Sequence, residues 1–203
     1  MTRGNLILLL LVVAIGLGIA AAASVLHDGL SARAKPTQME ALLARSARHM
    51  AMPSNALAAR NPVSASAESL RDGRVHFADH CATCHANDGG GDTMIGQGLY
   101  PKPPDLRLPA TQQLSDGELF WIIENGVRFT GMPAFGGHHS TQEDSWKLVL
   151  FIRHLPQLTA EERMEMERYN PKGPEDLQEE QEEQDFLRET PSQPKRESPH
   201  PRK

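Results

Sequence analysis

The only two cysteines of this 203-residue chain lie three positions apart, in the segment His80-Cys81-Ala82-Thr83-Cys84-His85. Cys-x-x-Cys-His is the pattern of covalent haem attachment. At this spacing two thiols can reach the two vinyl groups on one porphyrin edge, and the adjacent His85 imidazole comes under the iron as its proximal ligand. The motif therefore predicts one haem c, attached through Cys81 and Cys84, and a fold built around it.

Two other uses of the cysteine pair have to be weighed against haem attachment. A disulfide redox pair normally belongs to a strand-rich, thioredoxin-like setting, which the surrounding sequence does not indicate. A zinc site could combine the motif with His76 or His80. Structural zinc motifs, however, normally place a second pair of ligands some distance along the chain. We therefore expect haem.

The sixth ligand of the iron decides between electron transfer and small-molecule chemistry. Met132 is the best candidate, because it lies in the glycine-flanked segment 130–136 and is followed by Pro133, which fixes the backbone. Met94, in a glycine-rich loop soon after the motif, is expected to be a packing residue. The neighbouring pair His138 and His139 is expected in solvent, and bis-histidine ligation stays open as an alternative.

An uncharged apolar run from Leu6 to Leu26 follows a short end, residues 1–5, that carries Arg3. About 20 apolar residues of helix span a bilayer. Because basic residues stay on the cytoplasmic side, everything after the run is expected to be exported. The small residues 20–23 also allow a cleaved signal peptide. We favour the uncleaved anchor, because the run is longer than a usual signal core.

The rest of the chain divides by composition into a folded unit, residues 61–158, and its flanks. Residues 27–60 are expected to form a linker with a short helix, since Met39, Leu42, Leu43 and Met50 have helical spacing. Residues 159–170 are expected to form a helical extension. Residues 171–203, acidic and proline-containing, are expected to be disordered. The net charge of −5, with its acidic excess in the folded unit and tail, excludes nucleic-acid binding as a function.

Three helices are predicted inside the folded unit, and the fold class is all-α. The first covers Ser66–Cys81 and has a gap at Gly73 in its apolar face. The last covers Gln142–Leu155 and opens with a capping pattern. Crossing these two helices at Gly73 would bury Phe77 and Trp146. A middle helix is predicted over Ser115–Gly126, with a capping box at its start and glycine at its end.

The order of helix, Cys-x-x-Cys-His motif, glycine and proline loop, helix, Gly-Met-Pro loop and closing helix resembles class I cytochrome c over residues 61–158. The resemblance implies that the Pro104 carbonyl accepts a hydrogen bond from the second nitrogen of His85, with Pro103 as the other possibility. It also implies that Leu106 presses on the haem plane. The subgroup most similar in sequence contains membrane-anchored cytochromes and cytochrome subunits of respiratory and dehydrogenase complexes.

The expected function is one-electron transfer, with no catalytic residues of its own. The chain would act as a single-pass protein of a bacterial inner membrane, with its haem domain in the periplasm. It would be a free carrier or a subunit that works between a quinol-oxidising or dehydrogenase complex and an acceptor. The alternative is a haem-based ligand sensor or small-molecule-binding protein, in which Met132 is absent from the iron or leaves it.

Overall fold

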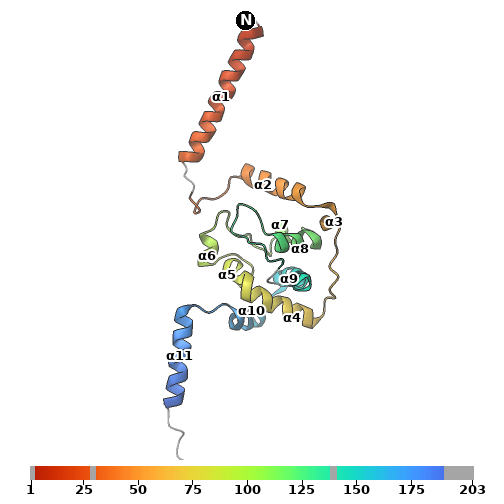
Figure 1. Cartoon of the computed structure of the whole chain (residues 1–203), viewed down its shortest axis with the longest axis vertical. Helices are drawn as coiled ribbons and strands as arrows, with labels where there is room; N and C mark the ends of the chain where they lie inside the picture. The colour runs from red at the N-terminus through yellow and green to blue at the C-terminus, as the bar shows by residue number, and fades with distance from the viewer. Residues whose placement is uncertain (1–2, 28–30, 138–140, 190–203) are drawn as a thin grey trace, which may run out of the picture. The chain divides into compact units, whose positions relative to one another are not determined.

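The computed structural model describes residues 3–27, 31–137 and 141–189. Within these residues every regular element is a helix, which confirms the all-α expectation (Figure 1). The chain separates into two compact units, Met1–Asn170 and Pro171–Lys203. The first unit holds the haem motif and all the segments that surround it.

The apolar run near the amino terminus is a single helix, α1, Arg3–His27. Its first 21 residues, Arg3–Ala23, are long and apolar enough to cross a membrane. A signal sequence meets the same criteria of length and composition. The predicted apolar helix is therefore present, and its length and composition fit both an uncleaved membrane anchor and a cleaved signal peptide.

Two helices follow in the segment expected to be a linker. The first, α2, covers Gln38–Ala51 and begins with a reciprocal capping box, in which Thr37 accepts from the Glu40 N–H and the Glu40 carboxylate accepts from the Thr37 N–H. A short helix, α3, covers Ser54–Leu57. The chain then enters the domain proper, where Asn61 donates a hydrogen bond from its side chain to the Trp146 carbonyl at 2.9 Å.

Two long helices, α4 (Ala67–His76) and α9 (Gln142–His154), cross at Gly73, as the sequence predicts (Figure 1). A Cβ atom at Gly73 would lie only 2.2 Å from the carbonyl oxygen of Lys147. Glycine is therefore required here because the two backbones touch. The crossing buries Phe77, 1% exposed, and Trp146, 8% exposed. The Phe77 ring packs on Phe151 with 5.1 Å between centroids.

The predicted middle helix is α8, Asp116–Asn125. Its capping box joins Ser115 and Glu118, and Gly126 ends it in a conformation with φ 65°. Leu119 and Ile123 face the core. On another side of α8 the Phe120 ring stacks on Trp146, with 4.0 Å between centroids and 10° between planes. We call α4, α8 and α9 the helical frame.

The first predicted helix does not run as a regular α-helix to Cys81. After His76 the backbone widens into a π-helical turn, η1, Phe77–Cys81, and then returns to a short helix, α5, Ala82–His85. Such turns are rare and occur often at functional sites. Two more short helices, α6 (Met94–Gln97) and α7 (Pro109–Gln112), lie in the long connection between α5 and α8.

The expected helical extension consists of α10, Ala160–Met166, between the short 3₁₀ turns η2, Leu155–Gln157, and η3, Glu167–Tyr169. It packs tightly on the frame, since Met166 is fully buried. Asn170 closes the unit by donating to the Ala78 carbonyl at 3.2 Å, inside the π-helical turn. The folded unit therefore continues to Asn170 instead of ending near residue 158.

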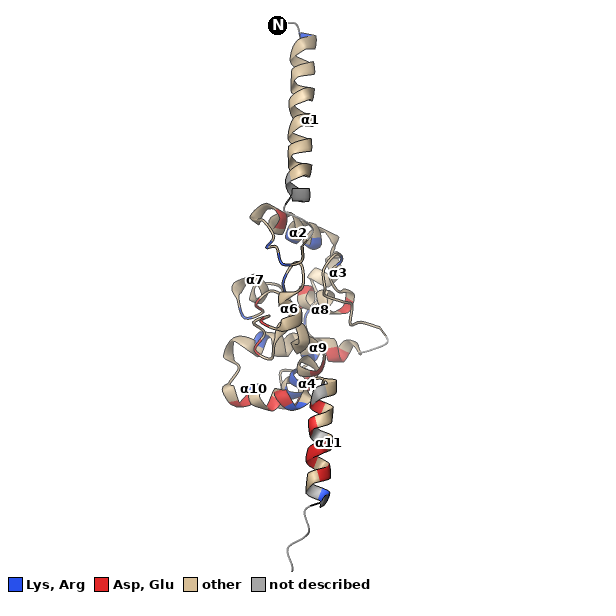
Figure 2. Ribbon diagram, turned by 90° about the vertical axis from the view of Figure 1, so that its left-hand side faces the viewer, with Lys and Arg blue, Asp and Glu red and all other residues tan. Residues whose placement is uncertain are grey.

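In the second unit, residues Pro174–Glu189 form a helix, α11. Acidic residues dominate its charge (Figure 2). Glu, Gln, Leu and Arg, which make up most of this segment, are all good helix formers. Low apolar content argues against a packed core, and it does not argue against a local helix. Residues 190–203 lie outside the described residues.

Candidate haem site

The Cys-x-x-Cys-His motif lies where the π-helical turn gives way to α5. Cys81 is the last residue of η1, while Cys84 and His85 end α5. Both thiols are free. The helix ends abruptly at Ala86, whose φ is 60°. This left-handed residue turns the chain away directly after His85.

The loop after the motif fixes the backbone of His85. The Gly91 N–H donates to the His85 carbonyl at 2.8 Å, and the Thr93 hydroxyl donates to the Thr83 carbonyl at 2.8 Å. Gly91 has φ 77°, and a Cβ there would lie 2.9 Å from the Pro103 carbonyl oxygen. The glycine and proline loops therefore pack directly on one another beside the motif.

Burial shifts the His85 imidazole toward its neutral form. Burial lowers the pKa of His85, and the neighbouring Pro104 carbonyl acts in the opposite direction with a smaller effect. Nδ1 of the ring is buried and has no partner of full hydrogen-bond geometry among the described residues. Neutral imidazole is the form that binds a metal.

The chemistry of the cysteines disfavours a redox pair. Cys81 packs against the hydrophobic core. Burial, with a smaller effect from Cys84, raises the pKa of the Cys81 thiol to about 12. Redox-active cysteines instead have lowered pKa values, because the thiolate is the reactive species. The described residues contain no group of three or more His, Cys, Asp or Glu side chains that could hold a metal ion.

The sequence predicts roles for two residues of the proline loop, Pro104 and Leu106. Pro104 is the residue whose carbonyl affects His85, whereas Pro103 contacts Gly91 instead. Leu106 is 8% exposed and belongs to the hydrophobic core, and its N–H donates to the Gly89 carbonyl at 2.9 Å. The structure thus places Pro104 and Leu106 on the same loop, immediately beside the motif.

Met132 lies in a closed turn after α8. The Val127 N–H donates to the Met132 carbonyl at 3.1 Å, and the Met132 N–H donates to the Thr130 hydroxyl oxygen at 3.1 Å. The chain then runs back along the end of α8, where the Phe135 N–H donates to the Ile123 carbonyl at 3.0 Å. Backbone bonds to the frame on both sides therefore hold the methionine loop, residues 126–136.

Two contacts bring the methionine loop toward the other parts of the site. A Cβ on Gly131 would lie 2.7 Å from both Cδ atoms of Leu99, so the loop packs on the chain just before the proline loop. On the other side, the rings of Phe135 and His80 meet edge to face, with 6.2 Å between centroids. His80 directly precedes Cys81, so the loop with Met132 and the motif border the same region.

The other candidates for the sixth ligand are Met94, His138 and His139. Met94, which was expected to be a packing residue, is 90% exposed. It is the first residue of α6, whose N-terminus is capped by Thr93. His138 and His139 lie outside the described residues.

Several apolar side chains of the connecting loops are exposed. Phe129, in the methionine loop, is 93% exposed and has the strained φ of 62°. Met94, Ile95 and Leu108, from the connection between α5 and α8, are 90%, 47% and 53% exposed. A cofactor bound between these loops would give such side chains apolar surface to pack on. Two free thiols, a neutral imidazole with a buried, unbonded nitrogen and these side chains together fit a covalently attached haem.

Sequence reasoning missed three contacts that shape the site. Leu99 supports the methionine loop, His80 meets Phe135, and Thr93 caps both α6 and the motif turn. The first two join residues more than thirty positions apart, and no local pattern encodes them. Thr93 could have been found, because a threonine directly before a short helix is a typical N-cap.

Residues 68–152 match the protein-family model described as Cytochrome C oxidase, cbb3-type, subunit III. The match begins in α4 and ends in α9, and it includes the motif, the proline loop and the methionine loop. A search of the curated proteins found no significant match to the chain.

Proposed function

Residues 68–152 are a cytochrome c domain of the class I family, and from this we propose that the chain transfers single electrons through one covalently bound haem c. When bound, the haem supplies a one-electron couple between ferrous and ferric iron. The observation that carries the proposal is the turn from Cys81 to His85, where two free thiols precede a half-buried imidazole with a buried Nδ1.

Each residue of the turn has a proposed task. Cys81 and Cys84 form the thioether bonds, and His85 binds the iron through Nε2. Pro104 accepts a hydrogen bond from the other ring nitrogen, which fixes the ring and makes it a stronger donor to the metal. That the Pro104 carbonyl already affects the pKa of His85 supports this pairing. Leu106, on the same loop, packs on the haem plane.

Met132 is the proposed sixth ligand. A thioether ligand favours ferrous iron and raises the potential. The backbone bonds of the methionine loop support a stiff ligand, which limits the rearrangement that accompanies each electron. The same ligand closes the iron to small molecules, and this separates an electron carrier from a ligand sensor.

The proposed setting is a bacterial inner membrane, with α1 as an uncleaved single-pass anchor and the haem domain in the periplasm. The apolar length of Arg3–Ala23 and the basic residue at its start support this orientation. Redox proteins are the expected partners, and the chain itself is no enzyme. The name of the matching family, that of an oxidase subunit, favours a cytochrome subunit of a respiratory complex over a free carrier.

Optical spectra of the protein, purified from membranes of cells that mature c-type haem, test the axial ligands. In Met132→Ala we expect the weak long-wavelength band of the ferric protein to disappear and the ferrous protein to bind carbon monoxide. Met164→Ala is the control, because Met164 is 60% exposed on α10, outside the loops around the motif, and should leave the spectrum unchanged. An unchanged spectrum in Met132→Ala would mean that Met132 is not the sixth ligand, and it would favour the sensor function.

The assignment as a complex subunit needs a separate measurement. We expect the tagged full chain to co-purify with a stable set of membrane proteins after gentle solubilisation. Recovery of the haem protein alone, with an unchanged spectrum, would instead indicate a free carrier.

A further inference from the structure

Helix α2 carries an apolar stripe that faces away from the haem domain. Its members are Met39, Leu42, Leu43 and Met50, which are 65%, 56%, 62% and 78% exposed. Their spacing of three, one and seven residues places them on one side of a helix. Each exposes more than half of its surface, so the domain covers none of them.

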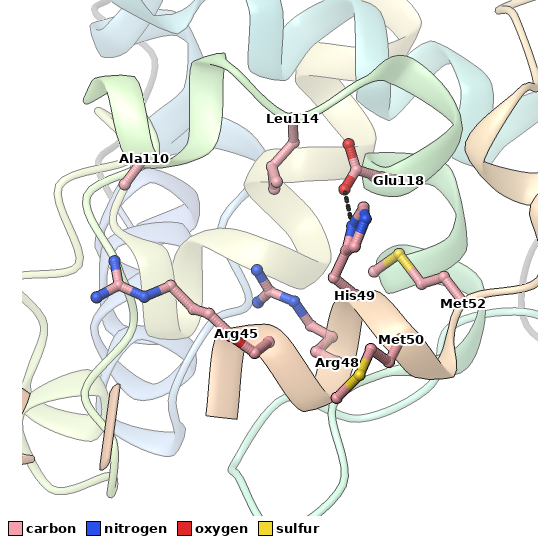
Figure 3. A pocket seen from close by; sticks show the side chains of 9 residues that line it. Arg45, Arg48, His49, Met50, Met52, Ala110, Leu114 and Glu118 are labelled. Carbon is pink, nitrogen blue, oxygen red and sulfur yellow. Dashed lines mark hydrogen bonds and ion pairs between the residues drawn. The ribbon is translucent and has the colours of Figure 1, made fainter. Parts of the chain in front are cut away.

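Side chains outside the apolar stripe fix α2 to the domain. The Tyr100 hydroxyl donates to the Glu40 carboxylate at 2.5 Å, and the His49 ring lies 3.2 Å from the Glu118 carboxylate of α8 (Figure 3). Burial lowers the pKa of Arg48, which lies half-buried on this side. Just beyond the helix, Met52 is 5% exposed. These contacts fix the rotation of α2 about its axis, so the apolar stripe is held outward.

The charge of this region is basic. Residues 31–52 contain four arginines and lysines, Arg33, Lys35, Arg45 and Arg48, against the single acid Glu40. Glu40 is already engaged with Tyr100. Arg45 and Arg48 line a pocket of about 380 Å³ between α2, α7 and α8, and neither forms an ion pair with a carboxylate among the described residues. Arg48 faces the domain and Glu118 lines the same pocket, so the charge available to an anionic surface is that of Arg33 and Lys35, which are exposed just before α2.

The position of α2 in the chain limits how far it can lie from a bilayer. Ten residues separate His27, at the end of α1, from Gln38. A fully extended chain covers at most about 3.5 Å per residue. If α1 spans a membrane, the start of α2 therefore lies within about 35 Å of the end of that span.

We propose that α2 lies in the interface of the membrane, with its apolar stripe among the lipid headgroups and acyl boundary. The inference rests on the proposed anchoring through α1. A helix with an apolar stripe, basic residues on its other sides and low overall hydrophobicity binds lipid surfaces in this way. The bilayer is favoured over a protein partner as the occupant of the stripe, because the proposed anchor α1 keeps α2 close to the lipid surface whatever partner is present.

The consequence is a fixed orientation of the haem domain. Through Tyr100 and Glu118, α2 is joined to the proline loop and to the start of α8. Leu99, next to Tyr100, packs on Gly131 of the methionine loop. A helix bound to the lipid surface therefore holds the side of the domain with these loops in a defined position relative to the bilayer. Partners embedded in the same membrane then meet one face of the domain.

Spin labels on adjacent positions of α2 test the inference directly. The full-length haem protein is placed, one copy per disc, in nanodiscs of phosphatidylethanolamine and phosphatidylglycerol, and Leu43→Cys or Ala44→Cys is labelled. The native cysteines do not react, because the haem occupies them. Ala44 is the matched control, since it is exposed and lies outside the apolar stripe. At position 43 we expect collisions with a water-soluble nickel reagent to fall several-fold relative to position 44, and collisions with oxygen to rise.

Three results would overturn the inference. Equal exposure of both labels to the nickel reagent would place α2 in water. Spin–spin broadening at position 43 in discs that hold two copies, together with water exposure in discs that hold one, would show that a second copy of the chain covers the stripe. Failure of the protein to enter discs would reject the anchor together with this inference. An intact haem spectrum in the same sample would show that haem attachment, on which the proposed electron transfer depends, does not require α2 to bind the membrane.

Discussion

The helical frame and the loops between its helices are stabilised in different ways. In the frame, large side chains interlock, and Phe151, Leu148 and Val149 are fully buried. In the loops, the backbone is held by close approaches at glycines and by single hydrogen bonds, while Met94 and Phe129 project into solvent. The frame therefore contains its own core, whereas the loops present apolar surface to a group that is not part of the polypeptide.

This difference assigns separate tasks to the two regions. The frame sets the positions at which the loops begin and end, and the loops supply the ligands. Substitutions in the frame should change the free energy of unfolding before they change the haem spectrum. Substitutions in the loops should do the reverse.

The largest effect is expected for Gly73→Ala in the frame. The new Cβ would lie 2.2 Å from the Lys147 carbonyl oxygen, so α4 and α9 must move apart and their shared core must open. We expect a loss of about 3 kcal/mol in the free energy of unfolding, measured by circular dichroism in guanidinium. Gly98→Ala is the control, because its nearest contact is 3.3 Å away. A loss as small as in Gly98→Ala would mean that the helices do not cross at Gly73.

A smaller loss of stability, with a larger change in the spectrum, is expected for Gly126→Ala at the start of the methionine loop. Its φ of 65° is strained for alanine, and the new Cβ would lie 2.6 Å from the Pro133 carbonyl carbon. Strain of this kind costs about 1–3 kcal/mol. We expect the loop to relieve it by moving, which weakens the Met132 ligand and lets the ferrous protein bind carbon monoxide. If the variant lost stability but kept a normal spectrum, the methionine loop would behave like the frame, because it would contribute to folding without controlling the iron ligand.

The smallest effect is expected at Glu162, whose ionisation makes the free energy of unfolding depend on pH. Burial alone would raise the pKa of Glu162, but hydrogen bonds from the Thr159 N–H and His154 outweigh it and lower the pKa. A lowered pKa in the folded state adds stability at pH values above 4.5, the usual pKa of this group, and that stability disappears as the pH falls through the folded pKa.

Urea unfolding at neutral and acidic pH measures this contribution. Glu162→Gln should lose about 1 kcal/mol at neutral pH and should depend less on acid than the native chain. Arg74 also contacts Glu162, at 2.9 Å, so the expected loss includes this ion pair. An unchanged acid dependence in the variant would show that other carboxylates account for it.

Local patterns in the sequence accounted for most of the frame. The capping boxes at Ser115 and Thr141 and the spacing around Gly73 place the starts of α8 and α9 and the crossing. These features are visible because capping and helix packing depend on residues three or four positions apart. The helix of the second unit, α11, was missed because composition was used there in place of helix propensity.

For the site, the sequence determined the chemistry and only the tertiary structure decided the arrangement. Cys81, Cys84 and His85 are adjacent, so their spacing alone predicts haem attachment. The sequence could not show that Leu99 supports the methionine loop or that the apolar stripe of α2 faces outward. The first depends on a contact between distant segments, and the second on hydrogen bonds that set the rotation of a helix. Neither leaves a repeating pattern in the chain, because only the folded backbone brings those residues together.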